Sequence, residues 1–190
     1  MPGSPELCDR VVQAAENAGF EYLLIPVGSV CWEAWITGAF MAARSSKIKP
    51  HGRDSEIGFG MRLQVICREQ EEDAWEAADR LVRHATERQK QEMKTLYNNS
   101  AANQRVQQLA REHGDLLLPH LWTGITKVRP GAGIAVVGNP AQCAATLQQF
   151  IDVGCHSFCL SGYLHDEEAE RFGRLIRPIL AENNRGRLAV

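Results

Sequence analysis

Apolar residues recur along this chain at two different spacings, and the first of them predicts helices. Leu7, Val11 and Ala14 recur at helical spacing, and Gly19 follows them, so we expect one helix to end at this glycine. The same spacing predicts helices that include residues 32–43, 74–85, 106–113 and 140–153, and a last helix from about residue 166 that Pro178 bends or shortens.

The second spacing is a strict alternation, which predicts strands. It is clearest from Ile57 to Cys67, where every odd-numbered residue is apolar and Arg62 and Gln64 lie at even-numbered positions. Shorter strands are expected at 22–27, 134–137 and 157–163. Because helices separate the strands, we expect an α/β protein with a parallel sheet, whose ligands bind near the carboxyl ends of the strands.

The last expected strand has one apolar face and one polar face. Phe158 and Leu160 are expected to point toward covering helices, whereas the odd-numbered residues of 157–163 point the other way. Arg62 and Gln64 give the earlier strand a similar polar face. Two interpretations stay open, a ligand-binding side or the solvent-exposed face of an incomplete sheet.

The composition is that of a soluble globular protein with a single domain over residues 1–190, since 44% of the residues are hydrophobic and 23% are charged. The net charge of −2 gives no electrostatic reason to expect a nucleic acid or an anionic membrane as partner. No apolar run is long enough to span a bilayer, so we expect a cytoplasmic protein.

The cysteines fit that compartment. All six are scattered along the chain, and free thiols are the default in a reducing cytosol. The cluster Cys155-His156-x-x-Cys159 lacks the second pair that a structural zinc site needs, so we expect buried thiols there and no metal.

Several stretches, taken together in their order and spacing, resemble one known family. They are GFEYLLIP (19–26) with CWEAW (31–35), HGR (51–53) leading into FGMRLQVI (59–66), LWTG (121–124) with VRPGAG (128–133), and LSGYLH (160–165). The chain resembles the bacterial-luciferase-like flavin monooxygenases, and most closely the FMNH2-dependent alkanesulfonate monooxygenases.

The resemblance implies a (β/α) TIM barrel and a reaction. FMN, supplied as FMNH2 by an NAD(P)H-dependent FMN reductase, would react with O2 to oxygenate an alkanesulfonate, splitting it into an aldehyde and sulfite for sulfur metabolism. The family's first strand and its middle strands have no counterpart here, so we expect a partial barrel with about half of the eight strands.

The resemblance also implies site residues. Cys31 matches an active-site cysteine near the flavin, Arg129 an arginine on a mobile loop that closes over the site, and Tyr163 a tyrosine that donates a hydrogen bond to substrate or oxygen. For Cys31 a buried structural role stays open, and for Arg129 an exposed loop position. His165 lies in the same motif as Tyr163, and Trp122 in the matching LWTG stretch is expected in the core.

Three further residues are expected to contact substrate or flavin, namely Arg62, Gln64 and Ser161. Gln64 stands where the family has a histidine, and a glutamine can donate a hydrogen bond but cannot exchange a proton near neutral pH.

An incomplete barrel leaves sheet edges and apolar surface uncovered, so we expect a homo-oligomer. Three functions stay open on the sequence. The first is an alkanesulfonate monooxygenase, the second a catalytically inactive remnant that acts as an oligomerising or interaction protein, and the third a related flavin enzyme with another substrate, such as a sulfone or an aldehyde.

Overall fold

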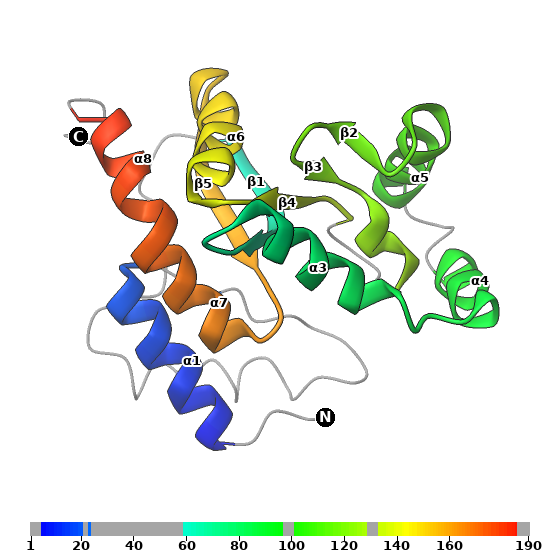
Figure 1. The fold of residues 1–190 in the computed structure, drawn as a ribbon, viewed down its shortest axis with the longest axis horizontal. Coiled ribbons are helices and arrows are strands. Elements are labelled where there is room, and N and C mark those ends of the chain that lie inside the picture. Colours follow the sequence, from blue (N-terminus) through cyan, green and yellow to red (C-terminus); the bar gives the residue numbers. More distant parts are fainter. Residues whose placement is uncertain (1–4, 21–22, 24–58, 97–100, 129–132, 186–190) are drawn as a thin grey trace.

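The computed structural model describes residues 5–20, 23, 59–96, 101–128 and 133–185 as a mixed α/β protein with one five-stranded sheet (Figure 1). The strand expected at 22–27 and the helix expected at 32–43 lie outside the described residues, apart from Leu23. In the described ranges, no helix is long and apolar enough to cross a membrane.

The sheet has the strand order β2-β3-β4-β1-β5. Its strands are β1 (Phe59–Cys67), β2 (Leu116–Leu118), β3 (Leu121–Trp122), β4 (Ala135–Gly138) and β5 (Cys155–Ser161). The alternating segment is therefore the central strand, and it pairs in parallel with β4 on one side and β5 on the other. The last strand was expected at 157–163, but it begins two residues earlier and ends at Ser161.

The expectation of a parallel sheet holds for three strands only. β3 pairs antiparallel with both β2 and β4, and a two-residue turn at Pro119 and His120 joins β2 to β3. So short a connection allows only antiparallel neighbours, because a parallel crossover needs a dozen or more residues. Sequence periodicity missed this hairpin because its strands have three residues and two residues.

The helices have these bounds: α1 (Pro5–Ala18), α3 (Glu71–Val82), α4 (Glu87–Leu96), α5 (Ala101–His113), the 3-10 turn η1 (Gly124–Lys127), α6 (Pro140–Asp152), α7 (His165–Arg171), the π-helical segment η2 (Phe172–Ile176) and α8 (Arg177–Asn183). Gly19 ends α1 with a positive φ of 76°, as expected. The last helix was expected to be bent or shortened by Pro178, but helical structure continues past this residue to Asn183. The π-helical segment η2 lies just before Pro178, whose ring removes a helical hydrogen bond.

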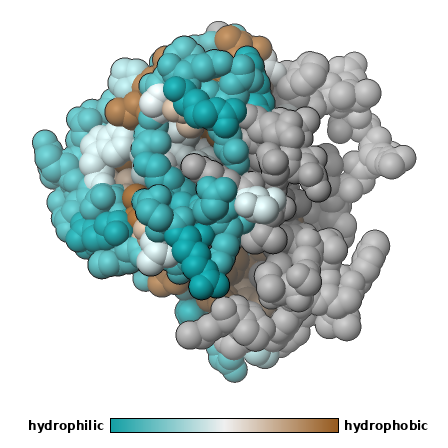
Figure 2. Space-filling view, turned by 90° about the vertical axis from the view of Figure 1, so that its right-hand side faces the viewer, coloured by the Kyte–Doolittle hydropathy of each residue, from teal (hydrophilic) through white to brown (hydrophobic). Residues whose placement is uncertain are grey.

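One expected helix ends earlier than expected, and a further helix that was not expected follows it. The segment that was expected to continue through Ala85 ends at Val82, and α4 begins at Glu87. Thr86 and Gln89 start the second helix as a capping pair, because the Gln89 amide donates to Thr86 Oγ1 at 3.2 Å and the Thr86 amide donates to Gln89 Oε1 at 2.9 Å. Figure 2 shows that the described part of the face on the α4 and α5 side is mostly hydrophilic.

The two faces of the sheet carry two separate apolar cores. On one face Leu63, Val65 and Cys67 of β1 pack with α6 and with Ile176 of η2. On the other face Ile66 of β1 packs with Ala74, Ala77 and Ala78 of α3 and with Trp122 and Ile125. Trp122 is thus in the core, as expected. Helices therefore cover both faces, whereas a TIM barrel keeps its helices outside, and the partial barrel is not confirmed.

An ion pair joins α1 to α7 and gives the fold a specific acid dependence. Arg10 Nε lies 2.9 Å from Asp166 Oδ2, and this hydrogen bond holds the pKa of Asp166 below its ordinary value of 3.8. The pair contributes its full stability above that ordinary value and loses it as the pH falls through the lowered pKa of the folded state. Because Arg10 is 62% exposed, the contribution is below about 1 kcal/mol.

We therefore expect the free energy of unfolding to decrease less between pH 4 and pH 2 in Asp166→Asn than in the unmodified protein. Urea unfolding at several pH values across that range measures this difference. Asp79→Asn, which alters an exposed pair within one helix, is the matched control. Parallel acid profiles for Asp166→Asn and the unmodified protein would show that this pair does not link stability to pH.

Candidate functional site

The polar faces expected on two strands lie side by side in the structure. In the parallel pairing of β1 with β5, Arg62 is opposite Cys159 and Gln64 is opposite Ser161. Residues opposite each other in a parallel pair share a face, so all four belong to one face of the sheet. Phe158 and Leu160 pack into the core on the other face, which confirms the expected alternation of β5.

Two buried polar atoms on this face have no hydrogen-bond partner. Gln64 is only 1% exposed, yet its Nε2 is unpartnered in the described structure, and so is the buried hydroxyl of Ser161. A buried polar group without a partner costs about 1–3 kcal/mol, and native proteins rarely leave one. Two such atoms at paired positions make this face the candidate place for a bound molecule that would supply the missing acceptors.

Arg62 adds a positive charge to the same face. Its side chain is exposed, and among the described residues it has neither an ion-pair partner nor a hydrogen bond. Together Arg62, Gln64 and Ser161 offer a guanidinium, an amide N–H and a hydroxyl, all of which donate hydrogen bonds. We call these three residues the donor face. It suits a ligand with carbonyl or anionic oxygen atoms.

A second polar cluster, at the carboxyl ends of β1 and β4, is satisfied internally. Glu71 accepts from Gln142 Nε2 at 2.6 Å and from Trp75 Nε1 at 3.3 Å, and Gln142 Oε1 accepts from the Asn139 amide at 2.8 Å. The hydrogen bond from Gln142 is the main reason that the pKa of Glu71 lies below its ordinary value. This cluster caps α6, and its hydrogen-bonding groups need no ligand.

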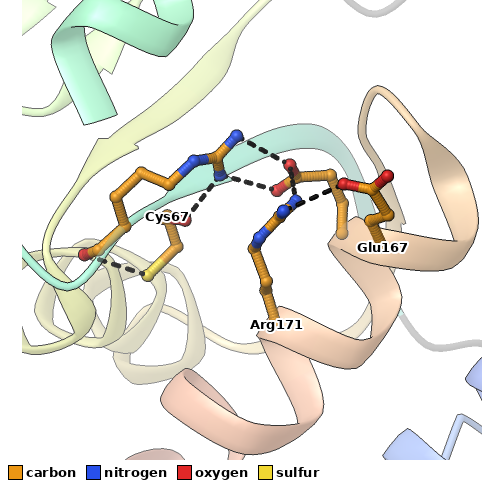
Figure 3. A network of polar contacts seen from close by, with 5 residues as sticks. Cys67, Glu167 and Arg171 are labelled. Carbon is orange, nitrogen blue, oxygen red and sulfur yellow. Dashed lines mark hydrogen bonds and ion pairs between the residues drawn. The ribbon is translucent and has the colours of Figure 1, made fainter. Parts of the chain in front are cut away.

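A third polar cluster is an ion-pair network at the carboxyl ends of β1 and β5 (Figure 3). Glu168, whose side chain is 7% exposed, accepts from Arg68 Nη2 at 3.0 Å and from Arg171 Nη1 at 2.7 Å. Arg68 also donates to the carbonyl of Cys67 at 2.7 Å, and Arg171 reaches Glu167 at 2.9 Å. The sequence patterns did not predict this network, and its central pair joins residues that lie 100 positions apart in the chain.

Gly162 connects this network to the donor face. It follows Ser161 directly, and a Cβ placed on it would lie 2.6 Å from Cβ and Cγ of Glu168 and 3.3 Å from the Val65 carbonyl oxygen. Only glycine permits this close approach, which holds the end of β5 against α7.

The structure places Tyr163 and His165 together but outside the strand. Tyr163 lies two residues past the end of β5 and is 40% exposed, and its ring meets the His165 ring edge-on with centroids 6.3 Å apart. His165 is the first residue of α7. The expectation that Tyr163 ends the last strand is therefore wrong, because β5 is displaced toward the amino terminus. Its position at the carboxyl end of the sheet remains.

Two candidate residues, Cys31 and Arg129, lie outside the described residues. Among the expected site residues that the structure describes, the fold brings Arg62, Gln64 and Ser161 onto one face of the sheet. Tyr163 and His165 form a separate pair. The described ranges contain no group of three or more histidine, cysteine or acidic side chains that could hold a metal ion.

An α/β fold with an unsatisfied donor face across two parallel strands is typical of the class of proteins that bind small molecules at a sheet, and makes this face the candidate site. The family model of the luciferase-like monooxygenases matches residues 48–157, which is more than half of the chain. The chain belongs to this family, whose members are flavin-dependent monooxygenases that in general use a reduced flavin. The matched range includes Arg62 and Gln64 and ends before Ser161.

Proposed function

We propose that this protein is a flavin-dependent monooxygenase that uses FMNH2 and O2 to convert alkanesulfonates to aldehydes and sulfite. The observation that carries the proposal is the donor face, in which the Gln64 amide and the Ser161 hydroxyl are buried without partners. Membership of the luciferase-like monooxygenase family supports the reaction type. The alkanesulfonate rests on the motif resemblance and on the chemistry of Arg62.

The donor face fits a flavin. The isoalloxazine ring carries carbonyl oxygens and ring nitrogens that accept hydrogen bonds, and Gln64 Nε2 and Ser161 Oγ are donors that lack acceptors. When bound, the reduced ring supplies the electrons that activate O2, and the protein positions it. Gln64 is neutral, so it contributes a fixed hydrogen bond rather than a proton.

Arg62 fits the sulfonate of the substrate. A guanidinium keeps its charge at all physiological pH values and offers forked donors that match the geometry of an oxyanion. Arg62 is exposed and has no acidic partner among the described residues, so its charge is available to a ligand. Arg129 would add a second guanidinium by loop closure, and Cys31, Tyr163 and His165 would complete the site as the resemblance implies.

A second function is favoured by one feature of the sheet. The edge strand β2 exposes Leu116 and Leu118, which are 48% and 49% exposed. An exposed apolar edge strand favours association with another chain. An interaction protein, with or without catalysis, is therefore the alternative, and self-association into a homo-oligomer or contact with an FMN reductase would use such an edge.

The first test is an anaerobic titration with reduced FMN, followed by tryptophan fluorescence. Trp75 and Trp122 belong to the core on the donor-face side of β1, so a bound flavin is expected to quench them. We expect saturable binding in the micromolar range, which corresponds to about −8 kcal/mol. Sulfite release with O2 and an alkanesulfonate then tests the substrate.

Two arginine variants separate the substrate site from a general charge effect. Arg62→Gln is expected to raise KM for the sulfonate about 10-fold to 100-fold, because a charge-assisted hydrogen bond is lost. Arg80→Gln, on the exposed side of α3, should leave KM unchanged. If the protein is folded but reduced FMN does not quench its tryptophan fluorescence and no sulfite is released, the alternative function as an interaction protein is favoured.

A further inference from the structure

Two cysteine thiols that the proposed reaction does not use meet inside the protein. Cys67 is the last residue of β1 and is 1% exposed, and Cys143 lies in the first turns of α6 and is 0% exposed. Both belong to the same apolar core, on the face of the sheet opposite the donor face. Each thiol is reduced.

The backbone brings the two cysteines to the same residue, Gly138. Cys67 is opposite Gly138 in the pairing of β1 with β4, and Cys143 Sγ donates to the Gly138 carbonyl at 3.4 Å. The two side chains also share a hydrogen bond, which lowers the pKa of Cys67 and, together with burial, raises the pKa of Cys143. Of the two thiols, Cys67 therefore loses its proton more readily, and Cys143 keeps its proton.

We propose that Cys67 and Cys143 are a redox modification site, at which hydrogen peroxide closes a disulfide between the end of β1 and α6. The Cys67 thiolate attacks one peroxide oxygen, the O–O bond breaks, and a sulfenic acid and hydroxide form. The Cys143 sulfur then attacks the sulfenic sulfur, its proton leaves with the displaced hydroxide as water, and the S–S bond forms. In total two thiols lose two electrons and one peroxide becomes two waters.

The position of the pair at the end of the sheet makes this chemistry reachable. Cys67 Sγ donates to the carbonyl of Arg68 at 3.9 Å (Figure 3). The Arg68 side chain is 23% exposed. Cys67 is therefore one residue from a side chain that solvent reaches, and the proposed reaction requires a local opening at this end of the sheet that admits peroxide. This proposal does not depend on the flavin reaction.

Disulfide mapping on the unmodified 190-residue chain tests the proposal. The folded protein is treated with hydrogen peroxide, its remaining thiols are blocked with N-ethylmaleimide, and it is digested without reduction. Trypsin releases residues 63–68, which contain Cys67 alone, and Asp-N cleavage before Asp152 isolates Cys143 in residues 128–151. We expect mass spectrometry to detect these two peptides as one linked species, together with a higher urea midpoint under non-reducing conditions.

Two cysteine variants are expected to give opposite results in this experiment. Cys155→Ser removes a partly exposed thiol outside the pair and should keep the link, whereas Cys143→Ser should lose both the link and the rise in midpoint. If peroxide-treated protein that is still folded yields Cys67 only as the maleimide adduct, or linked to Cys31, Cys155 or Cys159, the proposed pair is wrong. Because the unmodified protein supplies the decisive peptide, the test does not depend on any variant folding.

Discussion

Replacing Glu168 with alanine is expected to lower the free energy of unfolding by about 3 kcal/mol. The carboxylate is almost fully buried and accepts from two guanidinium groups, at 3.0 Å from Arg68 and 2.7 Å from Arg171. Without it, Arg68 keeps only the carbonyl of Cys67 as an acceptor, and Arg171 keeps only the more exposed carboxylate of Glu167. The loss is measured by urea unfolding at neutral pH.

Glu167 provides the matched control, because it directly precedes Glu168 on α7 and its exposed carboxylate pairs with Arg171. Glu167→Ala should cost less than about 1 kcal/mol. Equal losses for the two variants would show that α7 tolerates the removal of either charge, and that burial of Glu168 contributes nothing specific.

Gln64→Leu is expected to change stability and flavin affinity in opposite directions. In the free protein the variant removes a buried Nε2 that has no partner, so the free energy of unfolding should rise by about 1–2 kcal/mol. In the complex it removes a donor, so the affinity for reduced FMN should fall about 10-fold to 100-fold. Urea unfolding and the anaerobic titration measure the two quantities on one preparation.

Gln142→Leu is the contrasting variant, since this glutamine is bonded on both sides, to Glu71 and to the Asn139 amide. Its loss should destabilise the protein and leave flavin affinity unchanged. If Gln64→Leu also destabilises the protein without affecting affinity, then Gln64 is a structural residue and the donor face is not a ligand site.

The sequence predicted those parts of the fold that depend on local patterns. The alternation in 57–67 correctly indicated a strand with Arg62 and Gln64 on one face, and the helical spacing over 140–153 correctly indicated α6. The hairpin of β2 and β3 was missed because strands this short have no measurable period, and the break after Val82 was missed because apolar spacing continues through Ala85.

The candidate site was likewise predictable only where it depends on local sequence patterns. Arg62, Gln64 and Ser161 could be assigned to polar faces from alternation alone, but that Gln64 and Ser161 are opposite each other depends on the register between strands. The Arg68–Glu168 pair and the Cys67–Cys143 contact join residues far apart in the chain, and no local pattern encodes them. They arise only when α6 and α7 pack on the sheet.

Gly162 packs tightly on Glu168, and this contact connects the donor face to helix α7. Ser161, at one end of this contact, is a proposed ligand-binding residue, and α7, at the other end, is tied through Asp166 to Arg10 of α1. A ligand that restrains the Ser161 hydroxyl would therefore also restrain two surface helices. Their amides should exchange with solvent deuterium more slowly once the site is filled, at positions that no ligand touches.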